Sequence, residues 1–298
     1  MIRGLTFVLS AYLLWAMFPL YFKALGIVSA LEILSHRIVW SLVFALIVLF
    51  FLRRWQWIKL IRINPKILLY FGASSLLIAI NWGTYIWAVL NGVVIDASFG
   101  YFINPLVTVL LGSICLREKL RKMQWISVGL AALAVLFLSL CRGSIPVVSL
   151  VLATSFAFYG LVRKVAPLGS LEGFSLESAI LFPFALGYLI YLGAIDQMVF
   201  WHADAHIDWL LLAAGPITAI PLLLFASGAR MIPYSILGIA QYSSPTIQFV
   251  MAITLFGEPL SMEQLFAFGL IWIAVALFTG ESIWWYKKLK ETKNSEER

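Results

Sequence analysis

Four residues that could bind or carry charge lie close together in the apolar stretch ALEILSHRIVWS: Glu32, His36, Arg37 and Trp40. If this stretch crosses a membrane, burying an arginine costs roughly 2.5 to 3.5 kcal/mol on insertion scales, so Arg37 should face protein or water. We predict that Arg37, His36 and Trp40 contact the substrate, with Arg37 binding an anion or carboxylate, and that His36 or Glu32 carries a coupling proton. A structural pair of Arg37 with Glu32, or an Arg37 side chain that reaches the membrane interface, is the alternative.

Two sets of polar residues repeat one another along the chain. The first shares one helix face through i, i+3, i+4, i+7 spacing: Tyr101, Asn104, Pro105 and Thr108. The second occupies the matching positions of a similar stretch later in the chain: Gln241, Ser244, Pro245 and Gln248. Tyr242, next to Gln241, is also predicted to contact the substrate. We predict two polar stripes that face each other and line a substrate site, with a helix kink at each proline. Simple hydrogen bonding between neighbouring helices is the alternative.

A third group lies in the stretch SLLIAINWGTYIWAVLNG. Asn81, Trp82 and Tyr85 share one helix face there and predict an aromatic cavity wall with one hydrogen-bonding amide. A packed aromatic contact between helices is equally open. Further along, Glu177 could hold a proton or a cation, although a solvated carboxylate near a helix start is the favoured interpretation.

Other polar residues give weaker signals. His202 and His206 are close enough to share a helix face, but no cysteine or carboxylate frame accompanies them, so we predict no metal site. Glu118 and Glu258 sit in turns, where we expect helix-end roles rather than transport. The chain has no Walker A, G-x-S-x-G or H-E-x-x-H sequence, so we expect no catalytic residue, no enzyme activity, no cofactor and no ATP-driven transport.

The elements that must position these residues are apolar helices. Hydrophobic residues make up 62% of the 298-residue chain, charged residues 12%, and the mean hydropathy is +0.97. These values indicate a polytopic membrane protein. The net charge of +7 comes from short basic clusters between apolar runs, so we expect no nucleic-acid partner. Both cysteines, Cys115 and Cys141, fall inside apolar runs and indicate no disulfide.

A membrane span needs about 20 apolar residues in a helix, because the helix satisfies every backbone group inside the bilayer. By this criterion the chain contains ten spans, the sixth of them short. The first carries no cleavage signature and is expected to be retained. The predicted spans are 5–25, 30–52, 67–90, 95–115, 123–141, 146–162, 177–195, 209–229, 235–256 and 264–285.

The stretch from Gly100 to Val135 recurs later in the chain, from Ala240 to Val275. Eight identities share the single offset between the two stretches, and no gap is needed to align them. A duplicated half-protein is the best explanation. We therefore predict one five-helix repeat at 1–142, a second at 143–286 and a basic cytoplasmic tail at 287–298.

Five helices are an odd number, so the second repeat must cross the membrane inverted relative to the first. The turns agree, since LREKLRKMQ is basic whereas the equivalent FGEPLSMEQ has no base. In that second turn Ser261 and Gln264 form an S-x-x-Q capping box. With both termini in the cytoplasm, 18 of the 21 Lys and Arg residues lie on the cytoplasmic side, as the positive-inside rule requires.

The motifs ALEILSHRIVWS, NWGTYIWAVLNG, SFGYFINPLV, AFYGLVRK and QYSSPTIQF resemble the RarD branch of the EamA family, in the drug/metabolite transporter superfamily. The resemblance covers essentially the whole chain. It implies ten helices in two inverted five-helix repeats, a bacterial inner membrane and a secondary transporter usually described as an exporter. RarD members are often labelled chloramphenicol-sensitive, which implies drug or small-metabolite efflux without fixing a substrate. The resemblance supports these positions as signatures: His36, Arg37, Trp40, Asn81, Trp82, Tyr101, Asn104, Gln241 and Tyr242.

We therefore expect an all-α polytopic membrane protein that exports a small metabolite or drug by alternating access, with proton coupling as one option. Its expected partners are a small-molecule substrate and the lipid bilayer, and the sequence leaves a homodimer open. Two other functions stay open: a small-metabolite uptake permease, and a membrane binding or assembly subunit that transports nothing.

Overall fold

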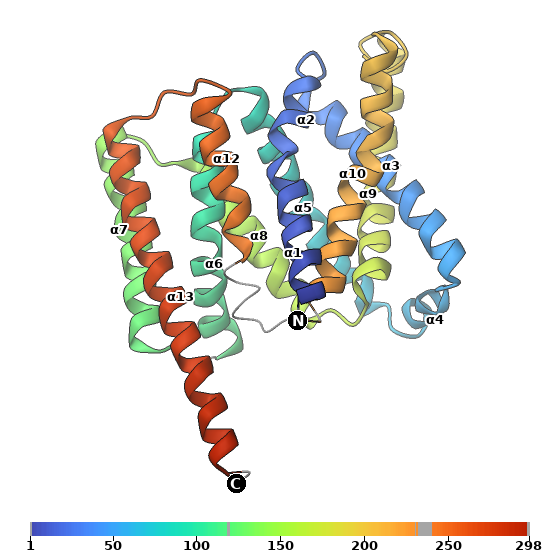
Figure 1. Ribbon diagram of the computed structural model, residues 1–298. Coiled ribbons are helices and arrows are strands. Elements are labelled where there is room, and N and C mark those ends of the chain that lie inside the picture. Colours follow the sequence, from blue (N-terminus) through green and yellow to red (C-terminus); the bar gives the residue numbers. More distant parts are fainter. Residues whose placement is uncertain (1, 118–119, 230, 232–239, 297–298) are drawn as a thin grey trace.

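The computed structural model describes residues 2–117, 120–229, 231 and 240–296. In these ranges all regular structure is α-helical, as predicted (Figure 1). The helices are α1 Ile2–Ala16, α2 Phe18–Ala24, α3 Ala30–Leu52, α4 Gln56–Ile63, α5 Lys66–Leu90, α6 Val94–Leu116, α7 Lys122–Arg142, α8 Val147–Val165, α9 Ser170–Ala194, α10 Ala205–Ala229, α12 Ser243–Thr254 and α13 Met262–Glu296.

The helices have the lengths and composition of membrane spans. In the described part, eight segments are long and apolar enough to cross a bilayer, and α8 contains a shorter apolar helix at Val147–Arg163. Residues 235–239 of the predicted ninth span lie outside the described residues, which resume before α12. The multi-pass class is therefore confirmed, whereas the count of ten spans stays a prediction.

Several predicted boundaries were wrong. The first span agrees with one candidate span at Arg3–Ala24, although a turn at Met17 separates α1 from α2, where Pro19 occupies the first turn. The seventh helix begins at Ser170 rather than at residue 177. Helix α4 was not predicted and has no buried residue. The last helix continues to Glu296 and includes most of the segment that we predicted as a tail.

The contacts between helices form matching pairs. Helix α5 packs on α8, and its equivalent α10 packs on α1. In the same way α6 packs on α8 and α12 packs on α1. Helix α5 also contacts α9, as α10 contacts α3. The remaining large contacts join α3 to α9, α6 to α12 and α7 to α13, and Figure 1 shows α7 and α13 side by side at one edge. Exchanging each helix with its equivalent in the other predicted repeat reproduces this pattern, as a duplicated chain would.

The turn before α13 shows how two helix ends are held. The predicted capping box is confirmed, because Ser261 Oγ accepts the backbone N–H of Gln264 at 3.2 Å and Gln264 Oε1 accepts that of Ser261 at 2.9 Å. The Glu258 carboxylate accepts the N–H groups of Val94 and Ile95, both at 2.8 Å. Glu258 therefore caps α6, a helix-end role as predicted, while Glu118 lies outside the described residues.

Replacing Glu258 by glutamine should destabilise the start of α6. The residue is 8% exposed, and its carboxylate faces two N–H groups at the positive end of the helix. An amide would turn one of its two acceptors into a donor, at a cost of about 1.5 to 3 kcal/mol for a lost charge-assisted hydrogen bond. Thermal unfolding of the detergent-solubilised protein measures the effect. Glu172→Gln, which alters a carboxylate paired with the exposed Arg54, is the control, and an equal midpoint in both variants would contradict the capping role.

Candidate functional site

The guanidinium of Arg37 is enclosed by aromatic rings from α2 and α5. Its Cζ lies 4.0 Å from the ring centroid of Trp82 and 5.3 and 5.8 Å from those of Phe18 and Phe22. Its Nε donates to Thr218 Oγ1 on α10 at 2.8 Å. The residue is 4% exposed, so it does not reach the interface, and none of the ion pairs in the described part of the chain involves it. Arg37 is a buried cation held by ring faces and one hydroxyl.

Glu32 is engaged elsewhere. Its Oε1 accepts the backbone N–H groups of Val199 and Phe200 at 2.8 and 3.2 Å, and the residue is 1% exposed. The carboxylate therefore fastens the first turn of α3 to the connection between α9 and α10. The alternative of a structural pair between Glu32 and Arg37 is wrong.

His36 interacts with Trp40 rather than with Glu32. Trp40 Nε1 donates to His36 Nδ1 at 3.2 Å, and the imidazole packs on Phe200 with 4.7 Å between ring centroids. Because Nδ1 accepts, the neutral ring carries its proton on Nε2. That atom is buried and has no hydrogen-bond partner among the described residues.

A chain of hydrogen bonds runs from α6 to α5 and α8. The Tyr101 hydroxyl donates to Asn81 Oδ1 at 3.3 Å, and Asn81 Nδ2 donates to the carbonyl of Leu152 at 3.0 Å and to Ser155 Oγ at 3.1 Å. Tyr101 also packs edge-on against Tyr85, with 5.5 Å between ring centroids. Asn81, Tyr85 and Tyr101 thus form one aromatic and amide surface, as the sequence predicted for the first two.

The two predicted polar stripes touch each other. Gln241 Nε2 donates to Asn104 Oδ1 at 3.4 Å, and Asn104 Nδ2 donates to the carbonyl of Ala153 at 2.8 Å. Asn104 is 2% exposed. The stripes therefore meet through a side-chain amide from each repeat, although the partner of Gln241 is Asn104 and not its repeat equivalent, Tyr101.

The Tyr242 hydroxyl is buried beside the same helices and has no hydrogen-bond partner in the described part of the chain. The Tyr85 hydroxyl and the Gln248 side chain lie within reach of each other. Gln248 uses its Nε2 to donate to the carbonyl of Trp15 at 3.0 Å and to Ser244 Oγ at 3.4 Å. The hydroxyls of Tyr85 and Tyr101 lie within electrostatic range of Arg37. A buried hydroxyl without a partner, such as that of Tyr242, usually marks a position where a ligand, ion or water completes the hydrogen bonding.

The two prolines of the polar stripes lie in different helix contexts. Helix α6 continues through Pro105, whereas the helix that contains residues 240–241 is interrupted at Tyr242, just before α12. Pro245 has no N–H to donate to the carbonyl of Gln241, four residues earlier, and the helix is interrupted between these two residues. Thr108 is half-buried on α6. The disturbance predicted at the second proline is seen as a single turn residue, Tyr242, three positions before it.

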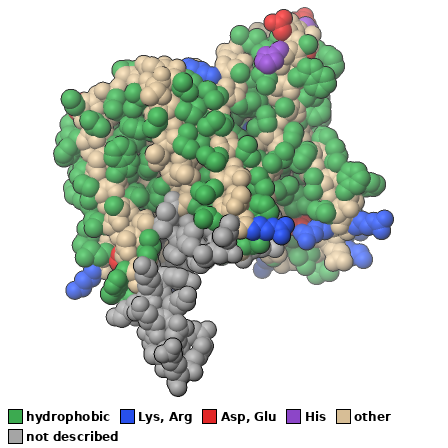
Figure 2. Space-filling model, in the orientation of Figure 1, with side chains coloured by type: hydrophobic (Ala, Val, Ile, Leu, Met, Phe, Trp, Pro, Cys, Tyr) green, Lys and Arg blue, Asp and Glu red, His purple; other side chains and the backbone are tan. Residues whose placement is uncertain are grey.

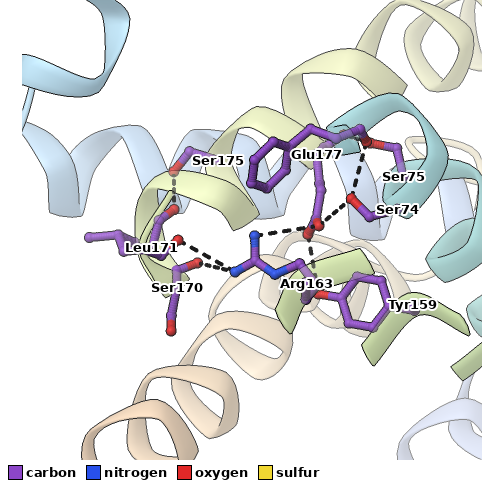
Figure 3. Close-up of polar contacts among 10 residues, drawn as sticks. Ser74, Ser75, Tyr159, Arg163, Ser170, Leu171, Ser175 and Glu177 are labelled. Carbon is purple, nitrogen blue, oxygen red and sulfur yellow. Dashed lines mark hydrogen bonds and ion pairs between the residues drawn. The ribbon is translucent and has the colours of Figure 1, made fainter. Parts of the chain in front are cut away.

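Glu177 lies at the centre of a second polar cluster, shown in Figure 3. Its Oε1 accepts from Ser74 Oγ on α5 at 2.7 Å and lies 3.6 Å from Arg163 Nη1 on α8. Its Oε2 accepts from the Tyr159 hydroxyl at 3.3 Å. The residue is 2% exposed. The favoured interpretation of a solvated helix-start carboxylate is therefore wrong, because α9 begins a full two turns earlier and this residue faces protein.

Sequence reasoning missed four residues that contact the predicted ones. Thr218 and Ser74 are hydroxyls in apolar runs and gave no signal of their own. Arg163 was assigned to a basic cytoplasmic cluster, and Tyr159 to an apolar helix. A weak signal did exist for the arginine, since a helix that extends to Val165 places Arg163 in its last turns, one helical turn after Tyr159.

The surface charge is distributed unequally between the two ends of the molecule. Figure 2 shows Lys and Arg side chains mainly along the lower side, while His and acidic side chains gather at the upper end of α10. Among the residues that the structure describes, no group of three or more His, Cys, Asp or Glu could hold a metal ion. His202 Nδ1 lies 3.2 Å from the carbonyl of Phe200, and Asp208 accepts the N–H of Trp201 at 2.9 Å.

Comparison with known proteins gives three kinds of similarity. The model of the EamA-like transporter family matches residues 2–140. "Uncharacterized transporter PA0485" of Pseudomonas aeruginosa is 45% identical over 279 residues, which cover 93% of this chain and 93% of that protein. Protein RarD of Streptomyces exfoliatus is 43% identical over 281 residues, 94% of this chain and 89% of its own. A solved crystal structure shares the fold with a TM-score of 0.54 at 15% identity, covering 92% and 96% of the two chains.

Proposed function

The chain belongs to the RarD branch of the EamA-like transporter family, and we propose that it is a secondary transporter that exports a small metabolite or drug by alternating access. The proposed location is the bacterial inner membrane, with both termini in the cytoplasm. The unequal distribution of basic side chains in Figure 2 supports this orientation.

The observation that carries the proposal is the buried cation at Arg37. A desolvated charge with no opposite charge nearby is costly, and inside a membrane span such a residue usually marks a functional site. Its Nε is bound to Thr218, so the two terminal nitrogens are the part of the guanidinium that can receive a ligand. A planar guanidinium binds a carboxylate or another oxyanion through two parallel hydrogen bonds. We therefore propose that the substrate carries an anionic group at this position.

The surroundings of Arg37 indicate the rest of the substrate. Trp82 lies against the guanidinium. Tyr85 and Tyr101 add two rings with hydroxyls, and Asn104 with Gln241 adds an amide pair. A site with aromatic walls and a few polar groups suits a small amphipathic or aromatic-bearing molecule. His36, Trp40, Thr108, Ser244 and Gln248 are further proposed contacts.

The location of these residues suits alternating access. Arg37 and Thr218 come from the two predicted repeats, as do Asn104 and Gln241. Inverted-repeat transporters place their substrate at such an interface and rock one half against the other. The matching helix contacts support the duplication.

We expect Asn104→Ala and Gln241→Ala each to reduce transport in proteoliposomes. Ligands are first identified by thermal shift of the purified protein against metabolites and drugs, and their saturable flux is then measured. Loss of one hydrogen bond of about 0.5 to 1.5 kcal/mol predicts a roughly two- to tenfold fall in kcat/KM. Asn91→Ala, at an exposed position after α5, is the matched control. Unchanged flux in both variants would locate the substrate site elsewhere.

A further inference from the structure

Glu177 connects three helices from both predicted repeats (Figure 3). It belongs to α9, accepts from Ser74 on α5, and contacts Tyr159 and Arg163 on α8. The adjacent Ser75 hydroxyl donates to the carbonyl of Phe71 at 2.6 Å and to that of Glu177 at 3.3 Å. A single carboxylate thus joins α5 of the first repeat to α8 and α9 of the second.

Arg163 and Glu177 form an ion pair without a direct hydrogen bond between them. Arg163 Nη1 is buried, has no hydrogen-bond partner among the described residues, and stays 3.6 Å from Glu177 Oε1. Nη2 makes only long contacts of 3.4 Å with the carbonyls of Gly169 and Ser170. The carboxylate receives its shorter bond from a neutral hydroxyl instead. A pair of this kind can separate without breaking a strong direct hydrogen bond, which suits a contact that must open and close.

Among the groups that face Glu177 in the described part of the chain, Arg163 is the charged one. Helices α3, α5 and α10 pack against α9. From α5 the facing groups are the Ser74 and Ser75 hydroxyls, and from α8 they are Tyr159 and Arg163. Within the described part of the chain, α3 and α10 place no charged group in contact with Glu177. Burial disfavours a charged carboxyl, whereas a guanidinium and hydroxyl donors favour it, so a small movement of Arg163 changes which form is preferred.

The repeat relationship points to the same residue. The offset that aligns Gly100 with Ala240 also aligns Arg37 with Glu177, so one position carries a buried cation in the first repeat and a buried anion in the second. Each binds a hydroxyl from the opposite repeat, Thr218 for Arg37 and Ser74 for Glu177.

The two other candidates for a coupling group are less free to change. Glu32 is held by two backbone N–H groups, from Val199 and Phe200. His36 is bound to Trp40. A change of charge at either residue would break contacts that hold α3 in place, whereas Glu177 meets side chains that can rearrange.

We propose that Glu177 is the proton-coupling site and that Arg163 is its internal counter-ion. A proton from the outer solution adds to one carboxylate oxygen, forming an O–H bond and a neutral carboxyl, and the ion pair with Arg163 is lost. The contacts from α8 to α9 then loosen on the cytoplasmic side. Release of the same proton to the cytoplasm restores the carboxylate and the pair. This inference rests on the proposed transport function and adds the identity of its driving ion.

The first test compares Glu177→Gln with Glu172→Gln in proteoliposomes. Glu172 lies earlier on α9 and pairs with the exposed Arg54, so it is a matched carboxylate control. We expect the wild type and Glu172→Gln to accumulate substrate when a pH gradient is imposed. Glu177→Gln should exchange labelled for unlabelled substrate at the wild-type rate but should not accumulate it. Accumulation by Glu177→Gln at the wild-type level would overturn the proposal, as would loss of exchange together with accumulation in the folded variant.

A second test moves Arg163 without altering any charge. A methyl group on Gly173 would collide with the Arg163 guanidinium and would lie 2.7 Å from the Phe71 ring. Gly173→Ala should therefore displace the arginine and weaken pH-driven accumulation while exchange continues. Gly187→Ala on the same helix, where nothing lies within 4 Å, is the control. Equal accumulation by both alanine variants would contradict the role of Arg163.

The proton-coupling site and the transport function are contradicted by different results. Wild-type exchange that ignores the pH gradient would overturn the coupling site while the transport function stands. Absence of any exchange by the wild-type protein, for every compound that it binds, would overturn both.

Discussion

Replacing Arg37 by glutamine is expected to abolish most of the transport activity while leaving the protein folded. A hydrogen bond to a charged group contributes about 1.5 to 3 kcal/mol, so losing the contact to an anionic substrate predicts a fall in kcat/KM of roughly ten- to hundredfold. The Arg37→Lys variant keeps the positive charge but lacks the planar guanidinium that makes two parallel hydrogen bonds. It should therefore bind the substrate more weakly than the wild type. Flux in proteoliposomes and ligand-induced thermal shift measure both effects.

The same substitution separates a binding role from a structural role. Arg37 has no carboxylate partner within the described residues, so its removal strands no opposite charge. It also removes a burial cost of roughly 2.5 to 3.5 kcal/mol. The contacts with the Trp82 ring and the Thr218 hydroxyl are lost at the same time, so we expect the unfolding midpoint of Arg37→Gln to stay close to that of the wild type. Arg62→Gln, in the exposed helix α4, is the control for charge removal. A strongly lowered midpoint with retained transport would show that Arg37 is structural.

Replacing Gly215 by alanine is expected to have the largest effect on stability. An added methyl group would collide with the Trp40 carbonyl oxygen and lie 2.6 Å from its carbonyl carbon. Both obstacles are backbone atoms of α3, which cannot rotate away, so α3 and α10 must separate. Thr218 lies one turn after Gly215, and so the hydrogen bond from Arg37 to Thr218 should be lost as well.

Overpacking of this kind costs about 1 to 3 kcal/mol or more. At roughly 2 to 4 °C per kcal/mol for a chain of this size, the unfolding midpoint of Gly215→Ala should fall by several degrees. Gly129→Ala on α7 has nothing within 4 Å and is the control. A midpoint unchanged from the control would mean that α3 and α10 do not approach so closely.

Much of the fold could be predicted because the bilayer imposes simple rules on the chain. Apolar length located the helices, and the prohibitive cost of a lipid-facing arginine indicated that Arg37 is buried in protein. The error at α9 has the same origin. The segment SLEGFSLES is too polar for an apolar span, yet its Ser175 and Glu177 face protein, and hydropathy does not distinguish a protein neighbour from water.

The partners of the site residues could not be predicted in the same way. Arg37 binds a hydroxyl 181 positions away, and Glu177 one 103 positions away. Helical spacing identifies which residues share a face but not which helix that face meets. The repeat predicted that the stripes around Pro105 and Pro245 face each other, whereas the contact between Asn104 and Gln241 could be found only in the structure.

The central claim, that this chain carries a small molecule by alternating access, is tested most directly by solute counterflow. Proteoliposomes of the wild-type protein are loaded with an unlabelled ligand from the thermal-shift screen and diluted into a trace of labelled ligand. A carrier must exchange one for the other, so we predict a transient accumulation of label above equilibrium, which Arg37→Gln abolishes. Label that only equilibrates at the rate of protein-free vesicles would contradict the account.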